Sequence, residues 1–139
     1  MGGSVIERSI KSLVLIRAKN LAESVETPML LIDAAGNLVF YNEGAENLLG
    51  TPFTDVGNVS SSEWEEKFKI RARDDKPAPL ERMPGWVDVT HERPGLGHVR
   101  ITTLDGRDLF IAVCTVPLFT AQDQFDGALV LFWEEPEGA

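Results

Sequence analysis

The sequence predicts an α+β domain, in which a five-stranded antiparallel sheet carries short helices on one face and an N-terminal helix on the other. A helical pattern opens the chain, and strand patterns separated by Gly/Asn turns follow it and also close the chain. The last strands are apolar at both alternating sets of positions. In a sheet with one wet face, one of these sets would be polar. We therefore expect helices on both faces of the sheet.

Residues 4–26 are predicted to form an amphipathic helix that begins with a capping box at Ser4 and Glu7. Apolar residues at helical spacing are Ile6, Ile10, Leu13, Leu21 and Val25, and the apolar surface is widened by Val14, Leu15 and Ile16. A helix with so wide an apolar surface usually contacts two partners. We expect these to be its own sheet and a second copy of the chain. The simpler alternative is packing on its own domain alone.

A hairpin follows, with strands over 29–33 and 38–42 and a turn that contains Gly and Asn. Asn42 is the expected N-cap of a short helix, and Gly50 is its expected C-cap. The next segment, 51–61, is predicted as a loop.

Two more short helices are predicted before the last strands. Ser61 or Ser62 is expected to cap the first, which directs Trp64 and Phe68 inward. The second lies within 79–92, and its inward residues are Met83, Trp86 and Val87.

The strand period returns at His98. We predict strands over 98–104, 109–118 and 127–134, with Asp105-Gly106 as the turn of a hairpin. The glycine-containing segment before His98 and the segment 120–126 are predicted as loops.

Length and charge limit the possible functions. The 139 residues correspond to one domain, expected over 27–135 after the helix of 1–26 and before a tail of 136–139. The net charge of −9 opposes binding to nucleic acids and to anionic membranes. A single cysteine, Cys114, excludes an intrachain disulfide. With no apparent signal peptide and no long apolar stretch, a cytoplasmic protein is expected.

Several short motifs occur in a suggestive order. They are the Leu31–Gly36 hairpin, Asn42 followed by Ala45, Leu48-Leu49-Gly50, the Asp105-Gly106 turn, Pro117-Leu118 and Gly127. In this order the sequence resembles the PAS family across residues 24–135. The resemblance implies a sheet that cups a small cavity, an N-terminal helix that forms homodimers, and a sensory role in signal transduction. It also implies an effector such as a kinase, cyclase or phosphatase, as in two-component systems. No effector follows Glu135, so we expect a free-standing protein or a piece of a larger one.

The resemblance also implies where a ligand would lie. The family register places four residues on the inner face of the sheet: Ile101, Ile111, Val113 and Leu129. Opposite them we expect Trp64, Phe68, Met83 and Trp86, which completes a candidate apolar pocket. It would hold a small apolar ligand such as a fatty acid, or it would simply be a packed core without a ligand. In the second case, pairing through helix 4–26 and the sheet face near Phe132 and Trp133 would be the whole function.

Flavin and haem are cofactors known in the family. Flavin is disfavoured, because Val59 stands where a light-sensing member needs cysteine and the ring's polar edge would face aliphatic side chains, at about 1–3 kcal/mol for each unpaired group. Haem remains an alternative through His91, with Arg93 or Arg100 near a propionate. A histidine at a helix end is otherwise an ordinary surface residue.

An enzyme is not expected. The acidic residues around Trp64 share their helix with Lys67 and Lys69, as on a solvated helix face. The spacing of His91 and His98 matches no usual metal site. A small α+β cone enzyme is the catalytic alternative, and it would need Tyr41 or Asp33 inside an apolar cavity.

Overall fold

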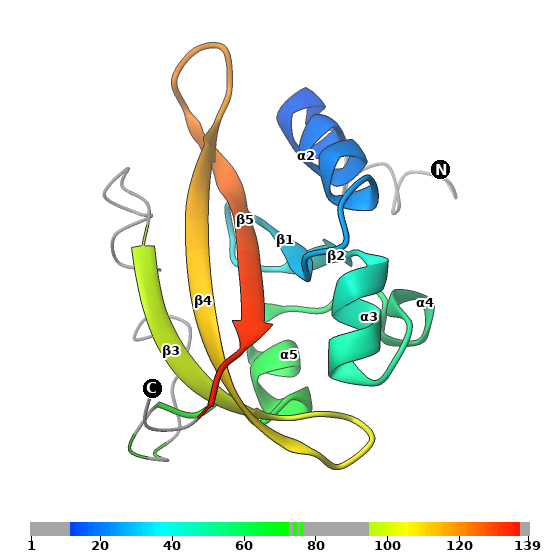
Figure 1. Cartoon of the computed structure of the whole chain (residues 1–139). Coiled ribbons are helices and arrows are strands. Elements are labelled where there is room, and N and C mark those ends of the chain that lie inside the picture. The colour runs from blue at the N-terminus through cyan, green and yellow to red at the C-terminus, as the bar shows by residue number, and fades with distance from the viewer. Residues whose placement is uncertain (1–11, 73, 75, 77–94, 137–139) are drawn as a thin grey trace.

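The computed structural model describes residues 12–72, 74, 76 and 95–136, and their strands form one antiparallel sheet in the order β2-β1-β5-β4-β3 (Figure 1). The predicted fold class is confirmed. The described strands are β1 Met29–Asp33, β2 Leu38–Tyr41, β3 Gly95–Thr102, β4 Asp108–Phe119 and β5 Phe125–Glu134. The described helices are α2 Leu13–Glu23, α3 Glu43–Leu49, α4 Phe53–Val56 and α5 Ser61–Lys67.

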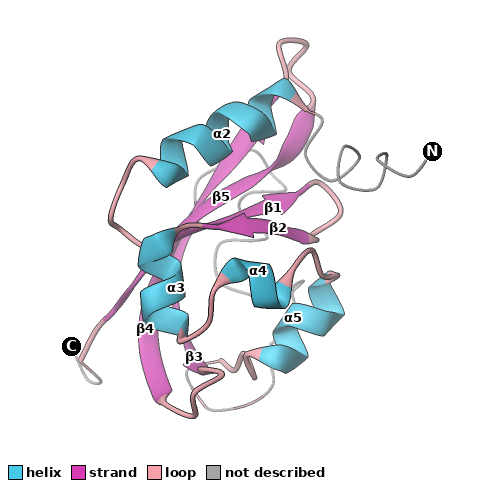
Figure 2. Cartoon of the chain, turned by 90° about the vertical axis from the view of Figure 1, so that its right-hand side faces the viewer, coloured by secondary structure: helices cyan, strands magenta, loops and turns pink. Residues whose placement is uncertain are grey.

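Helices cover both faces of the sheet, as the doubly apolar strands predict. On one face, Leu15, Ala18 and Ala22 of α2 pack against Leu31 of β1 and Leu129 of β5. The short helices α3, α4 and α5 lie together in Figure 2, apart from α2. Their buried side chains form the other half of the core with the opposite face of the sheet. None of the helices in the described ranges is long and apolar enough to cross a membrane.

The side chain of Asn42 joins three elements. Its Oδ1 accepts hydrogen bonds from the backbone N–H of Ala45 in α3 and of Met29 in β1, both at 3.0 Å. Its Nδ2 donates to the carbonyl oxygens of Ala22, Val25 and Thr27. The predicted N-cap is therefore confirmed, and the same side chain also holds the end of α2 against the start of the sheet.

The predicted bounds of the N-terminal helix are wrong. Ser12 has extended backbone angles and caps α2 by accepting the N–H of Leu15, so a continuous helix over 4–26 cannot pass through it. The hydroxyl of Ser12 also donates to the carboxylate of Asp126. The helix ends at Glu23, three residues earlier than predicted. Ser4, Ile6 and Ile10 lie outside the described residues.

The wide apolar surface predicted for this helix leaves open which face meets the sheet, and the structure decides it. Leu13 and Leu21 are exposed, and the smaller side chains of Ala18 and Ala22 make the contact beside Leu15. The small side chains of Ala18 and Ala22 let the helix axis approach the sheet closely, while Leu13 and Leu21 lie on the exposed side.

Local boundaries shift elsewhere for identifiable reasons. The segment predicted as a loop over 51–61 contains the short helix α4. The N–H of Phe53, the first residue of α4, donates to the Glu46 carboxylate at 2.7 Å. Ser60, and not Ser61 or Ser62, caps α5, because Glu63 completes a capping box with it. β3 begins at Gly95, since this glycine-containing segment continues the pairing with β4. The helix predicted within 79–92 lies outside the described residues.

The first prediction concerns Asn42. Asn42→Ala would remove the hydrogen bonds that this side chain makes to five backbone groups, three of them buried, and is expected to lower the free energy of unfolding by about 3 kcal/mol. The measurement is urea unfolding followed by circular dichroism. Asn47→Ala, on the exposed side of the same helix α3, is the matched control and should change stability by less than about 0.5 kcal/mol. Equal effects of the two substitutions would contradict the proposed role of Asn42.

Candidate functional site

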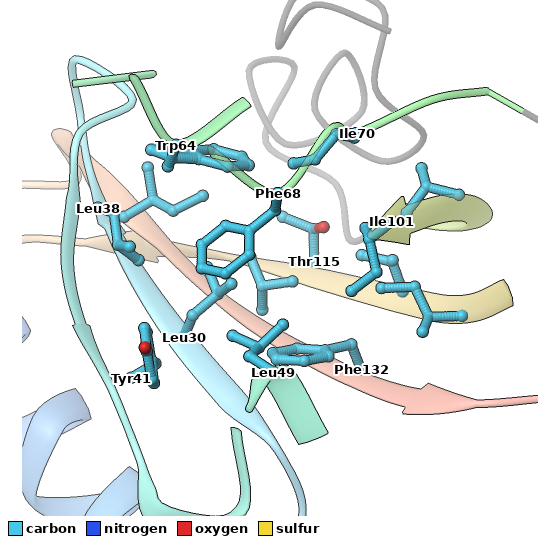
Figure 3. A pocket seen from close by; sticks show the side chains of 15 residues that line it. Leu30, Leu38, Tyr41, Leu49, Trp64, Phe68, Ile70, Ile101, Thr115 and Phe132 are labelled. Carbon is cyan, nitrogen blue, oxygen red and sulfur yellow. The ribbon is translucent and has the colours of Figure 1, made fainter. Parts of the chain in front are cut away.

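A small cavity lies between the sheet and the short helices, with a volume of about 60 Å³ (Figure 3). Its walls are almost entirely apolar. From the sheet it is lined by Leu30, Ile32, Leu38, Tyr41, Val99, Ile101, Ile111, Val113, Thr115, Val130 and Phe132. From the helices and the segment after α5 it is lined by Leu49, Trp64, Phe68 and Ile70.

The structure brings together most of the described residues that were predicted for a pocket. Trp64 and Phe68 come from α5 and its C-terminal end, and they face Ile101, Ile111 and Val113 across the cavity. All five are at least nine-tenths buried. Met83, Trp86 and the candidate haem ligand His91 lie outside the described residues.

The predicted position of Leu129 is wrong. Residues directly opposite each other in an antiparallel pair share a face of the sheet, and Val113 and Thr115 of β4 oppose Phe132 and Val130 of β5. Leu129 therefore faces the other way, and it packs with α2. The same register corrects Phe132, which was expected near an exposed edge and is only 2% exposed in the cavity wall.

Several residues of the cavity wall were not predicted from the sequence. The signal that could have identified them is the alternation of side chains along each strand, taken with the correct register. On β1, Leu30 and Ile32 alternate into the cavity, and on β5 Val130 and Phe132 do the same. Because Ala128–Trp133 is apolar throughout, the sequence itself does not show which alternate set faces inward.

Two of the three polar groups in the described lining already have partners within the domain. The Tyr41 hydroxyl donates to the carbonyl of Thr51 at 2.8 Å, and the Trp64 indole N–H donates to the carbonyl of Gly36 at 3.1 Å. Burial raises the pKa of Tyr41 well above its ordinary value, and the charges of Glu46 and Asp55 raise it further. Tyr41 is therefore a neutral hydrogen-bond donor, which is the wrong state for a catalytic base.

The other catalytic candidate, Asp33, is placed in the hairpin turn. Its Oδ1 accepts hydrogen bonds from the N–H groups of Ala35 and Asn37, and its Oδ2 accepts one from the Asn37 side chain. The carboxylate thus stabilises the turn between β1 and β2 and is not among the residues around the cavity. The described residues also contain no group of three side chains placed to hold a metal ion.

The size of the cavity limits its occupant. Pockets for drug-sized ligands measure roughly 300–1,000 Å³, whereas a water molecule takes up about 30 Å³. A void of about 60 Å³ is too small for a flavin, a porphyrin or an acyl chain unless the surrounding side chains move. Arg100, considered for a haem propionate, lies over the ring of Phe110, with 5.3 Å from Cζ to the ring centroid. It faces away from the cavity, because its neighbours Val99 and Ile101 face into it.

The opposite face of β3 and β4 carries a polar cluster at the C-terminal end of β5. His98 stacks on Phe110 and lies 2.9 Å from a carboxylate oxygen of Glu135. Trp133 donates its indole N–H to the other oxygen of Glu135 at 3.1 Å. The hydrogen bond with His98, followed by that with Trp133, lowers the pKa of Glu135. In this cluster His98 serves as the hydrogen-bond partner of a carboxylate.

Comparison with known proteins identifies the architecture. No family model matches the sequence, and no curated protein matches it. The structure resembles the PAS domain of BvgS from Bordetella pertussis, with a TM-score of 0.59 and 15% identity over 89% of this chain and 87% of that one. It also resembles the PAS domain of nitrogen regulation protein NR(II) from Vibrio parahaemolyticus, with a TM-score of 0.60 and 15% identity over 84% and 95% of the chains. The chain has the PAS fold.

Light-sensing members of this fold are similar in backbone as well. The LOV domain of the blue-light photoreceptor Aureochrome1 matches with a TM-score of 0.62 and 12% identity, over 88% of this chain and 90% of that one. At these identities the likeness concerns the PAS fold, so the ligand has to be argued from the cavity itself.

A second prediction follows from Tyr41, the only tyrosine of the chain. Tyr41→Phe removes the hydrogen bond to Thr51 and is expected to lower stability by about 1 kcal/mol at neutral pH. In the folded domain the raised pKa keeps the hydroxyl protonated, while the unfolded chain loses this proton near the ordinary value of 10.0. The stabilisation is thus complete below that pH and is lost as the pH rises beyond it.

Urea unfolding of both proteins from about pH 8 to about pH 11 checks this prediction, and the difference between them should shrink to near zero at the upper end. The absorbance of the phenolate provides an independent titration of this one side chain. A phenolate that forms in the folded domain at the ordinary tyrosine pKa would contradict the prediction.

Proposed function

We propose that this chain is a sensory or regulatory module of signal transduction. It pairs with a second copy of itself and responds to the binding of a ligand in its cavity. The observation that carries the proposal is the outer face of α2. Leu13, Ile16 and Leu21 are 60%, 38% and 54% exposed on this face. It lies opposite the face that Leu15, Ala18 and Ala22 press against the sheet.

A second copy of the chain is the occupant that best suits this surface. An apolar stripe on a helix can pair with the same stripe of another copy around a two-fold axis, and such a contact is complementary to itself. The same helix covers β1 and β5 with its opposite face. A change in the packing of the sheet would therefore reach the paired helices directly.

The cavity supports a binding role in preference to catalysis. Its described lining has no charged side chain, and Tyr41 is committed to a hydrogen bond. The proposed role is thus a binding module and not an enzyme. The signal of this module would be received by an effector that lies outside this sequence. A kinase, cyclase or phosphatase, as in two-component systems, would be such an effector.

The small volume of the cavity favours a second candidate function. At about 60 Å³ the core is nearly filled, and a module that only pairs two copies has no need of more space. In this alternative α2 and the sheet would be the whole functional surface and the cavity would be a minor packing defect.

A third prediction tests the pairing through α2. Leu13→Glu places a charge among the exposed apolar residues of α2 and is expected to convert a dimer into a monomer without unfolding the domain, since the Leu13 side chain is 60% exposed in the single chain. Sedimentation equilibrium measures the change, and the dimer constant should weaken by about 100-fold or more. Leu104→Glu is the matched control, because Leu104 is 44% exposed in the turn between β3 and β4. A Leu13→Glu protein that remains dimeric would place the interface elsewhere.

A fourth prediction separates the sensor from the pairing module. Native mass spectrometry of the purified protein is expected to give a dimer that carries additional non-covalent mass, which disappears on denaturation. A dimer of bare chain mass would favour the pairing module instead. A monomer of bare mass would contradict the proposed pairing.

A further inference from the structure

Thr115 is the one polar residue of the described cavity wall whose side chain has no hydrogen-bond partner among the described residues. It lies in β4 and is 4% exposed. In the described part of the chain, every side-chain nitrogen or oxygen atom that is fully inaccessible to solvent has a hydrogen-bond partner. Because the Thr115 hydroxyl has no partner, it is not fully enclosed by protein atoms and faces open space. That space is the cavity, and Figure 3 shows the oxygen of Thr115 among the side chains that surround it.

A hydroxyl in this position needs a partner to be favourable. Valine has the same shape as threonine, and a valine at 115 would fill the wall without burying a polar group. The neighbouring wall residues on β4 and β5, Val113 and Val130, are themselves valines. A buried hydroxyl without a hydrogen bond lowers stability. The side chain is therefore understandable if something inside the cavity exchanges a hydrogen bond with it.

Two glycines of β3 lie opposite this part of β4. Gly95 of β3 lies directly opposite Thr115, and Gly97 lies opposite Val113. Residues opposite each other share a face, so both glycines occupy positions on the cavity side of β3 and contribute no side chain there. Further along the same strand, Val99 and Ile101 fill the corresponding positions. The described part of β3 thus carries no side chain opposite Thr115 and apolar side chains further along the strand.

We propose that the cavity binds a small neutral organic molecule, with one oxygen or nitrogen atom hydrogen-bonded to the Thr115 hydroxyl and an apolar remainder against Phe68, Ile101 and Phe132. This inference rests on the proposed sensory function and names its class of ligand. Short alcohols, ketones, aldehydes and amides have this chemistry. A carboxylate would be buried without a charged partner in the described wall, so the head group of a fatty acid does not fit there.

The volume sets the expected affinity. About 60 Å³ admits only a few non-hydrogen atoms, and the contribution of each atom to binding is limited. Dissociation constants from roughly tens of micromolar to millimolar are expected, and exchange would be fast. Such a site would report the concentration of an abundant small metabolite.

The test uses acetone and xenon as probes on the whole chain, followed by NMR of methyl groups. Acetone is a small neutral molecule whose carbonyl can accept a hydrogen bond from Thr115, whereas xenon reports free apolar volume alone. Both are expected to shift the methyl signals of Ile101, Ile111 and Val113. In addition, acetone should show a direct contact with the Thr115 methyl group.

The variants separate the polar anchor from the volume. Thr115→Val is expected to weaken acetone binding about tenfold while leaving xenon binding within about twofold. Thr115→Ser keeps the hydroxyl and should retain acetone binding within about threefold. Thr54→Val, at an exposed position of α4, is the control and should change neither.

Three results would overturn the proposal. One is equal acetone binding by the Thr115→Val and wild-type proteins. Another is the absence of acetone shifts where xenon shifts are present. The last is a long-lived water held at the Thr115 hydroxyl, seen as a contact between water and its methyl group in the wild-type protein, which also decides the matter if Thr115→Val does not fold. None of these results changes the oligomeric state, so failure of the ligand proposal is distinguishable from failure of the pairing through α2.

Discussion

The pairing of β4 with β5 is the contact on which the rest of the core depends. These are the two longest strands, and their register sets Val113 against Phe132 and Thr115 against Val130. A shift by one residue would exchange every inward side chain of β5 for an outward one. The cavity wall would lose Phe132, and the surface beneath α2 would lose Leu129. Both faces of the domain are thus defined by one backbone ladder.

Asn42 performs a related task at the other end of the sheet. Its side chain connects the end of α2, the start of β1 and the start of α3 through backbone groups alone. Backbone contacts of this kind do not depend on which side chains surround them. They fix how α2 lies relative to the sheet, so the exposed stripe of α2 and the cavity on the far face belong to one connected body.

Among the described residues, the candidate site combines an apolar wall with one hydroxyl, that of Thr115, that has no hydrogen-bond partner. Tyr41 and Trp64 also carry polar atoms at the cavity, but each donates its hydrogen to a backbone carbonyl and so contributes only its ring to the wall. Thr115 differs because its neighbours across the sheet are Val130 and Gly95, neither of which offers a side-chain acceptor. The site is therefore suited to recognise a small molecule by shape and by one hydrogen bond.

The sequence by itself determined the fold class and much of the local structure. Turn chemistry predicted both hairpins, and the spacing of Asn42 and Gly50 predicted α3, because caps and turns depend on residues that are close in the chain. Helical spacing also placed Trp64 and Phe68 on the inner side, and the register of the PAS resemblance placed Ile101, Ile111 and Val113 there. Only the tertiary structure decided which set of β5 residues faces inward, because a strand that is apolar on both sides carries no alternation. It likewise decided that Leu15, Ala18 and Ala22 contact the sheet while Leu13 and Leu21 are exposed, since that choice depends on how closely two elements can approach.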